Sequence, residues 1–307
     1  MHEAMGSTIG KLREKIEARA PGTLAKFPVS AYIALFDAYP ALENYGFTSP
    51  AVSDMARAIA TSAGEQTSFD YHRLLLLELI SKNHAAVAAS DLPAVIKTLY
   101  AKNFSRIVDD VALERQPPDF HRHTNDKFLK DLGVCNRRII PAGTQKLNRY
   151  KFPLGALKGL GLAGALQSGM HLVTRLGGLS PVYDMHTDSH DADLMAEFSP
   201  EGWRRFYLNV AALLQVHTDV KGLYGIGWFF DAKVPEISPR LAYLRELVIE
   251  TGGRLSAVGV TDGARESALA TSPTRRKLHA EGKYLPTDFL AIWDRGSLIR
   301  WARASVR

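Results

Sequence analysis

The alternation of strand-like and helix-like segments in the last third of the chain most constrains its fold. Apolar runs of strand length stand there between amphipathic stretches of helix length. The predicted strands span 223–230, 254–260 and 288–293, and the predicted helices span 239–251 and 263–282. Such alternation is typical of a layer in which helices pack on a sheet. We therefore predict an α/β domain in this part of the chain.

The first third has a different pattern, in which apolar residues recur at helical spacing. Ile96 and Tyr100, four residues apart, are one example. The segment Arg115-Gln116-Pro117-Pro118-Asp119 ends this pattern, because adjacent prolines interrupt a helix. The sequence thus predicts an all-helical domain over residues 1–114, followed by a mixed-sheet α/β domain over residues 119–307.

Composition limits the class of protein. The chain has 307 residues, enough to bury a sizeable core. Its one cysteine, Cys135, excludes an intramolecular disulfide and a cysteine-rich zinc site, and it fits a reducing compartment. No apolar run reaches the roughly 18 residues that a membrane-spanning helix needs. We expect a cytoplasmic protein without a transmembrane segment.

The formal net charge of +6 favours an anionic ligand. The positive charges are spread along the chain and not gathered in a tail, so nothing points clearly to nucleic acid. Ser238-Pro239-Arg240 reads as the start of a helix, whose free N–H groups suit a phosphate. Arg275 and Arg276 can neutralise further phosphate charge. Ser238, Arg240, Arg275 and Arg276 are therefore candidate cofactor-binding residues, although most capped helices with a basic face bind nothing.

The predicted elements from 223 to 293, together with the segment from Lys277 to Tyr284, resemble the second half of the GNAT superfamily of acyl-CoA-dependent acyltransferases. In that family a strand leads to a loop and a helix N-terminus that hold the cofactor's pyrophosphate. A later helix ends in a pattern like Leu-Tyr-x-x-x-Gly-Phe before the last strand. The resemblance does not extend to the helical domain. The family's glycine-rich loop is missing, and residues 231–237 stand in its place.

The resemblance implies transfer of an acyl group from a thioester, either acyl-CoA or an acyl carrier protein, to an amine on a small molecule. His279 stands where the family often has the tyrosine that protonates the leaving thiolate, and Tyr284 is close by in sequence. A base must take the amine proton, and Asp184 and His186 are the candidates. The expected catalytic residues are Asp184, His186, His279 and Tyr284. The chain leaves open whether it forms an oligomer.

The segment from Asp184 to Asp193 supports a second hypothesis. On an extended strand Asp184, His186, Asp188 and His190 share one face. Alternating carboxylates and imidazoles suit iron, manganese or zinc, so His186, Asp188 and His190 are metal ligands in this alternative, which is not favoured. A third hypothesis is a basic module that binds an anionic partner or a membrane surface through the helix predicted near 154–176.

Overall fold

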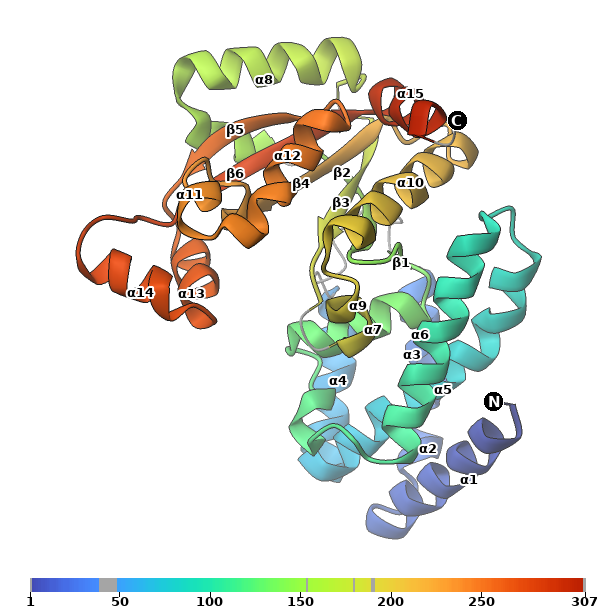
Figure 1. Ribbon diagram of the computed structural model, residues 1–307. Coiled ribbons are helices and arrows are strands. Elements are labelled where there is room, and N and C mark those ends of the chain that lie inside the picture. Colours follow the sequence, from blue (N-terminus) through green and yellow to red (C-terminus); the bar gives the residue numbers. More distant parts are fainter. Residues whose placement is uncertain (1, 39–48, 153, 179, 189–190, 306–307) are drawn as a thin grey trace. The chain divides into compact units, whose positions relative to one another are not determined.

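The structure is a computed structural model that describes residues 2–38, 49–152, 154–178, 180–188 and 191–305. The chain divides into two compact units, Met1–Pro141 and Ala142–Arg307 (Figure 1). No helix in the described residues is long and apolar enough to cross a membrane. Each unit is described by itself below.

The first unit is helical, as predicted. Its elements are α1 (His2–Arg19), α2 (Thr23–Lys26), α3 (Val29–Asp37), α4 (Pro50–Ala63), α5 (Glu65–Ala89), α6 (Ala94–Ala112), the 3-10 helix η1 (Pro118–His121), α7 (Asp126–Cys135) and the short strand β1 (Ile139–Pro141). The central helix is α5, which packs against α1, α4, α6 and α7. Its run from Leu74 to Leu77 is buried because it faces helices on several sides.

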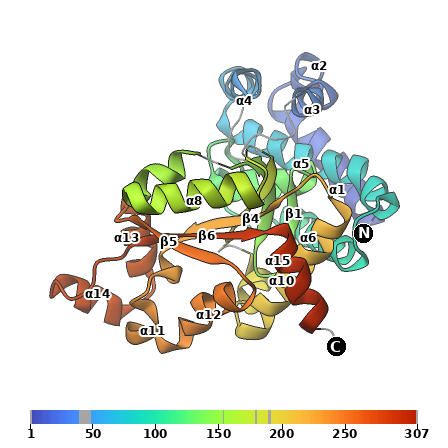
Figure 2. The same ribbon diagram turned by 90° about the horizontal axis from the view of Figure 1, so that it is seen from above.

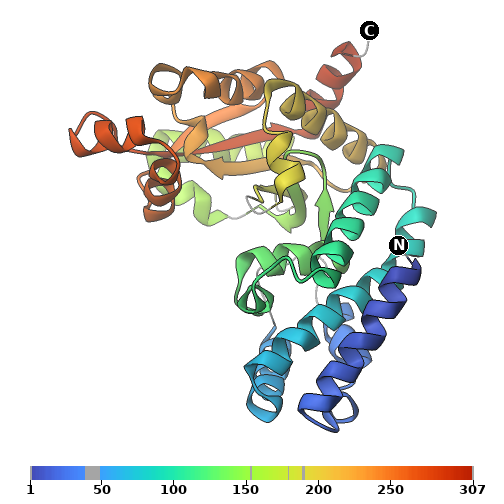
Figure 3. The ribbon, with the colours of Figure 1, turned by 60° about the horizontal axis from the view of Figure 1, so that its bottom comes forward.

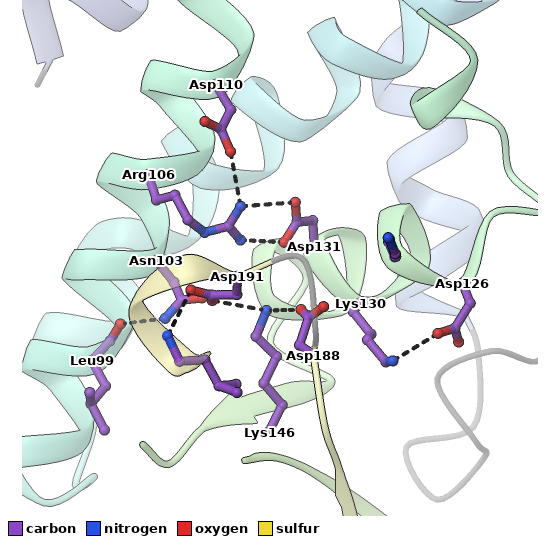
Figure 4. A network of polar contacts seen from close by, with 12 residues as sticks. Leu99, Asn103, Arg106, Asp110, Asp126, Lys130, Asp131, Lys146, Asp188 and Asp191 are labelled. Atoms are coloured by element: carbon purple, nitrogen blue, oxygen red, sulfur yellow. Dashed lines mark hydrogen bonds and ion pairs between the residues drawn. The ribbon is translucent and has the colours of Figure 1, made fainter. Parts of the chain in front are cut away.

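The units divide after Pro141, beyond the proline segment at 115–119 where the sequence placed the boundary. Helix α7 follows that segment and packs with the helical unit. The Arg106 guanidinium on α6 binds the Asp131 carboxylate on α7, and its Nη1 lies 3.1 Å from Asp110 Oδ2 (Figure 4). The Asn83 side chain donates to the Cys135 carbonyl at 2.9 Å. These long-range contacts have no signature in local sequence.

Two buried histidines of this unit make its stability depend on pH. Burial, as the largest cause, lowers the pKa of His72 to about 4 and that of His121 to about 3. The Arg73 guanidinium contributes at His121, where Arg73 Nε donates to Nδ1 at 3.4 Å. An unfolded imidazole titrates near 6.5, so the unfolded state binds more protons below that pH.

We expect the free energy of unfolding to fall as pH drops from about 6.5, by about 2 to 3 kcal/mol for each imidazole at about pH 4.5. Urea denaturation at neutral and acid pH measures this loss. The His72→Gln/His121→Gln variant is expected to lose much less on acidification. Equal acid sensitivity of the wild type and the variant would contradict the prediction.

The second unit contains a mixed sheet, which confirms the predicted α/β class. Its strands are β2 (Lys146–Lys151), β3 (Pro181–His186), β4 (Gly222–Gly227), β5 (Arg254–Gly259) and β6 (Asp288–Asp294). Within this unit the described strands are ordered β2-β3-β4-β6-β5. Strand β3 runs parallel to β4, whereas the β2–β3, β4–β6 and β5–β6 pairs are antiparallel.

The helices of the second unit are η2 (Leu154–Leu160), α8 (Gly161–Arg175), α9 (Ala192–Ala196), α10 (Pro200–Val216), η3 (Trp228–Phe230), α11 (Val234–Ile237), η4 (Pro239–Leu241), α12 (Ala242–Glu250), α13 (Asp262–Ala270), α14 (Pro273–Ala280) and α15 (Arg295–Ser305). Helix α8 covers one face of the sheet, where Leu172 and Leu176 pack on Val182 and Tyr224 (Figure 2). Helices α10 and α12 lie on the other face. There the Tyr207 ring on α10 lies 5.3 Å from that of Trp293.

Several predicted elements of the second unit differ in the structure. The strand expected over 223–230 ends at Gly227, and residues 228–230 form the 3-10 helix η3. The helix expected over 263–282 is two helices, α13 and α14, because Pro273 lacks an N–H and Ser272 caps a new helix by accepting from the Arg275 N–H. Both extend to one side of the sheet (Figure 3). The helix expected from 239 begins as the 3-10 turn η4 and becomes α12 only at Ala242.

Candidate active site

The parallel strands β3 and β4 are paired over only part of their length. Each has six residues, yet the described ladder joins them only at Tyr183 with Leu223 and at Asp184 with Tyr224. Beyond these pairs β3 continues to His186 and β4 to Gly227. The carboxyl ends of parallel strands are where open α/β sheets bind ligands. We call the carboxyl ends of these two strands, residues 184–186 and 224–227, the fork.

A row of polar side chains crosses the sheet at the start of the fork. Asn148 on β2 pairs with Asp184 on β3, which pairs with Tyr224 on β4. Side chains at paired positions point to the same face of a sheet. The Tyr224 hydroxyl donates a hydrogen bond to the Asp184 carboxylate. Three strands thus place Asp184 between two buried polar residues on the face that α8 covers.

Asp184 and His186 form a carboxylate–imidazole pair, as the alternation of strand residues predicts. His186 Nε2 lies 3.4 Å from Asp184 Oδ2, and the two side chains are 16% and 13% exposed. Burial raises the pKa of Asp184 to about 7, although the hydrogen bond from Tyr224 acts in the opposite direction. At neutral pH this carboxyl therefore exists in both protonation states, as a general base requires.

Asp188 has a different environment from the one that the metal hypothesis needs. It lies beyond the end of β3 and is buried in an ion pair with the Lys146 ammonium, which also lies 3.4 Å from Asp191 (Figure 4). A buried ammonium between two carboxylates takes the place that a metal cation would need.

The metal hypothesis has no support in the described part of the chain. His190 lies outside the described residues. Within residues 2–38, 49–152, 154–178, 180–188 and 191–305, no three His, Cys, Asp or Glu side chains are grouped so that they can hold a metal ion.

A second polar cluster forms around Arg275, which is 1% exposed. Its Nη1 donates to Ser238 Oγ at 3.0 Å, its Nε donates to the Ala268 carbonyl at 2.6 Å, and the guanidinium lies 4.5 Å from the Trp228 ring centroid. Arg275 and Asp231 both act electrostatically on the buried hydroxyl of Tyr284. The structure thus brings together Ser238, Arg275 and Tyr284, three of the residues singled out from the sequence.

The remaining candidates of this region have distinct environments. His279 is half-buried, and its Nδ1 lies 3.0 Å from the Tyr284 carbonyl, which leaves Nε2 for other partners. Burial raises the pKa of Tyr284 to about 12. Arg240 and Arg276 are exposed, and Arg276 Nη1 donates to the Leu269 carbonyl at 2.8 Å. Exposed guanidiniums of this kind are accessible to a phosphate, whereas Arg275 is occupied by internal contacts.

The neighbours Arg275 and Arg276 offer a matched test of this difference. We expect Arg275→Gln to lower the free energy of unfolding by about 2 to 3 kcal/mol, because hydrogen bonds of a buried charged group and a cation–π contact are lost. Arg276→Gln is expected to change it by less than about 0.5 kcal/mol. Chemical denaturation of both variants measures the free energy of unfolding. Equal losses in the two variants would show that the buried contacts of Arg275 do not stabilise the fold.

Sequence reasoning found Asp184 and His186 but missed Tyr224 and Asn148. Both reach Asp184 only through strand pairing. Tyr224 is the one polar side chain of β4, whereas β2 is mostly polar and Asn148 does not stand out in it. Lys146 was missed for the same reason. The roles of Asp184, His186, His279, Tyr284, Ser238, Arg240, Arg275 and Arg276 stay predictions.

Comparison with known proteins gives little further information. No protein-family model matches the chain, and no curated protein matches it. Among solved structures, the chain is similar to an acyltransferase crystallised in complex with decanoyl-CoA, with a TM-score of 0.45 and 10% sequence identity over 80% of this chain and 79% of the other.

Proposed function

We propose that the chain transfers an acyl group from a CoA thioester to an amine, with Asp184 as the general base. The observation that carries the proposal is the Asp184 carboxyl, whose pKa is raised to about 7 and which stands beside His186 at the start of the fork. The resemblance of residues 223–293 to the GNAT superfamily points to the same reaction class.

The reaction needs two protons removed from the nitrogen and one supplied to the sulfur. An ammonium substrate loses its first proton to one member of the Asp184–His186 pair, and the free amine nitrogen then attacks the thioester carbonyl carbon. The carbon–sulfur bond breaks, the nitrogen gives its second proton to the other member of the pair as the amide forms, and the departing thiolate needs a proton. An imidazolium at His279 can supply it from Nε2, since Nδ1 faces the Tyr284 carbonyl. Tyr284 is the weaker donor because burial raises its pKa to about 12.

The fork suits the pantetheine arm of such a donor. Main-chain groups of residues 184–186 and 224–227 line it, and an extended ligand with amide groups can hydrogen-bond to them as an added strand does. Gly225, on β4, has no side chain, and the buried Met185 side chain fills the space beside it. An acyl carrier protein carries the same phosphopantetheine arm, so the donor is acyl-CoA or an acylated carrier protein.

In this proposal the phosphates of the donor contact exposed cationic side chains that follow β4 in the sequence. Arg240 lies in η4, next to Ser238, and Arg276 lies in the first turn of α14. We propose that Arg240 and Arg276 contact the phosphates directly. Arg275 then acts as a positioning residue that holds Ser238 through its 3.0 Å hydrogen bond.

The proposal is tested by titrating acetyl-CoA and longer acyl-CoA thioesters into the protein in a calorimeter, followed by a thiol-release assay with a panel of amines. Binding that weakens in Arg240→Gln/Arg276→Gln, together with amine-dependent release of free CoA, supports the proposal. Absence of binding for both CoA and an acylated carrier protein would overturn it. A thioester hydrolysed at the same rate without amine would reassign the site to a hydrolase.

A further inference from the structure

Helix α8 carries large apolar side chains on two different faces. Leu172 and Leu176 are buried against the sheet. Leu166, Met170 and Val173 point away from it and are 64%, 68% and 67% exposed. We call these three residues the α8 stripe. A helix on the surface of a globular protein normally places polar residues on its outer face, so the stripe is unusual.

The spacing of the stripe makes it continuous. At about 100° per residue, positions 166, 170 and 173 lie within about 60° of one another on the helix. In Figure 2 no other described element of the second unit covers the outer side of α8. The stripe is therefore an apolar ridge along a 15-residue helix and not a set of scattered exposed side chains.

The chain around α8 is positively charged. Between Ala142 and Tyr183 there is no Asp or Glu, while there are five cationic residues: Lys146, Arg149, Lys151, Lys158 and Arg175. Lys146 and Arg149 are paired with Asp188 and Asp219. Lys151 and Arg175 are exposed and have no ion pair among the described residues.

His171 locates two cations close to α8. Arg254 on β5 and Arg175 in the last turn of α8 both act on its imidazole and lower its pKa, after burial as the larger cause. Asp294 faces the same imidazole with the opposite effect. The Asp294 carboxylate already accepts hydrogen bonds from the Ser297 N–H and hydroxyl at 2.9 and 2.6 Å. The margin of α8 thus combines free cations with one internally engaged acid.

We propose that α8 is an interfacial helix by which the protein docks on an anionic lipid bilayer. The α8 stripe enters the boundary between headgroups and acyl chains, and Lys151, Arg175 and Arg254 contact the lipid phosphates. With 15 residues α8 is shorter than the roughly 20 that span a bilayer, so it lies in the plane of the surface. A second copy is the poorer occupant, because a symmetric contact would place the same cations against each other.

The test is flotation of the full-length protein with vesicles of phosphatidylglycerol and phosphatidylcholine in equal parts, beside vesicles of phosphatidylcholine alone. We expect the Leu166→Ser/Met170→Ser/Val173→Ser variant to bind anionic vesicles about tenfold or more weakly than the wild type. The control variant Leu113→Ser/Ile249→Ser/Val95→Ser removes similarly exposed apolar side chains elsewhere and is expected to bind as the wild type does. Arg175→Gln is expected to weaken binding about fivefold.

Three outcomes would overturn the proposal. The first is failure of the wild type to float with anionic vesicles at low salt. The second is an equal loss of affinity in the stripe variant and the control variant, which would remove α8 from the interface. The third is a wild-type dimer, seen by light scattering, that the stripe variant lacks, which would make the stripe a contact between copies. The assay needs no acyl donor, so its result is independent of the proposed transferase activity.

Discussion

Replacing Asp184 with Asn is expected to lower the rate of acyl transfer by about 10²- to 10⁴-fold, the usual contribution of a general base. The amide keeps the size of the carboxyl group and can still accept a hydrogen bond from Tyr224, but it cannot take a proton. Affinity for the acyl-CoA donor is expected to remain, because in the proposed function the donor is held by the fork and by Arg240 and Arg276. Transfer rates at saturating amine, beside calorimetric binding of the donor, measure the two effects separately.

The pH dependence provides a second readout of Asp184. The wild-type rate is expected to rise through about pH 7, where this carboxyl ionises, and the Asn variant should lack that step. Stability has the opposite trend. The native carboxyl binds a proton more tightly than the unfolded one, so its contribution to stability declines as pH rises from about 4 to about 7.

A suitable control is Asp219→Asn, which removes a half-exposed carboxylate paired with Arg149. It is expected to leave both the rate profile and the donor affinity unchanged. A full rate in the Asp184→Asn variant would exclude Asp184 as the base and leave His186, which His186→Gln then tests.

Replacing Lys146 with Met is expected to destabilise the second unit by about 3 to 5 kcal/mol. The ammonium is 1% exposed and pairs with Asp188, which is fully buried, so its removal leaves a carboxylate buried without its cation. The free energy of unfolding from chemical denaturation measures the loss.

The double variant Lys146→Met/Asp188→Asn separates lost charge pairing from lost packing. We expect it to recover a substantial part of the stability that Lys146→Met loses, because the uncompensated charge is gone. If the double variant instead loses as much stability as Lys146→Met and Asp188→Asn lose together, a direct ion pair between the two residues would be contradicted. Tighter binding of zinc or manganese by Lys146→Met than by the wild type would revive the metal hypothesis for Asp188.

Local pattern predicted much of the second unit. The strands predicted over 254–260 and 288–293 are β5 and β6. Both have the length and apolar content of a strand, and the turn residues Gly252 and Gly253 directly precede β5. Helix α7 and the C-terminal helix α15 were not predicted. Their apolar residues are buried by tertiary contacts that a short window does not contain.

The sequence by itself determined that Asp184 and His186 share a face, because side chains alternate along any strand. It also determined the helical character of the first third and the excess of cations around α8. Only the tertiary structure decided what these residues contact. Parallel pairing of β3 with β4 brings Tyr224 to Asp184, and pairing of β2 with β3 brings Lys146 close to Asp188. Strand order depends on how the whole sheet buries its two faces, and residues distant in sequence therefore complete the candidate site.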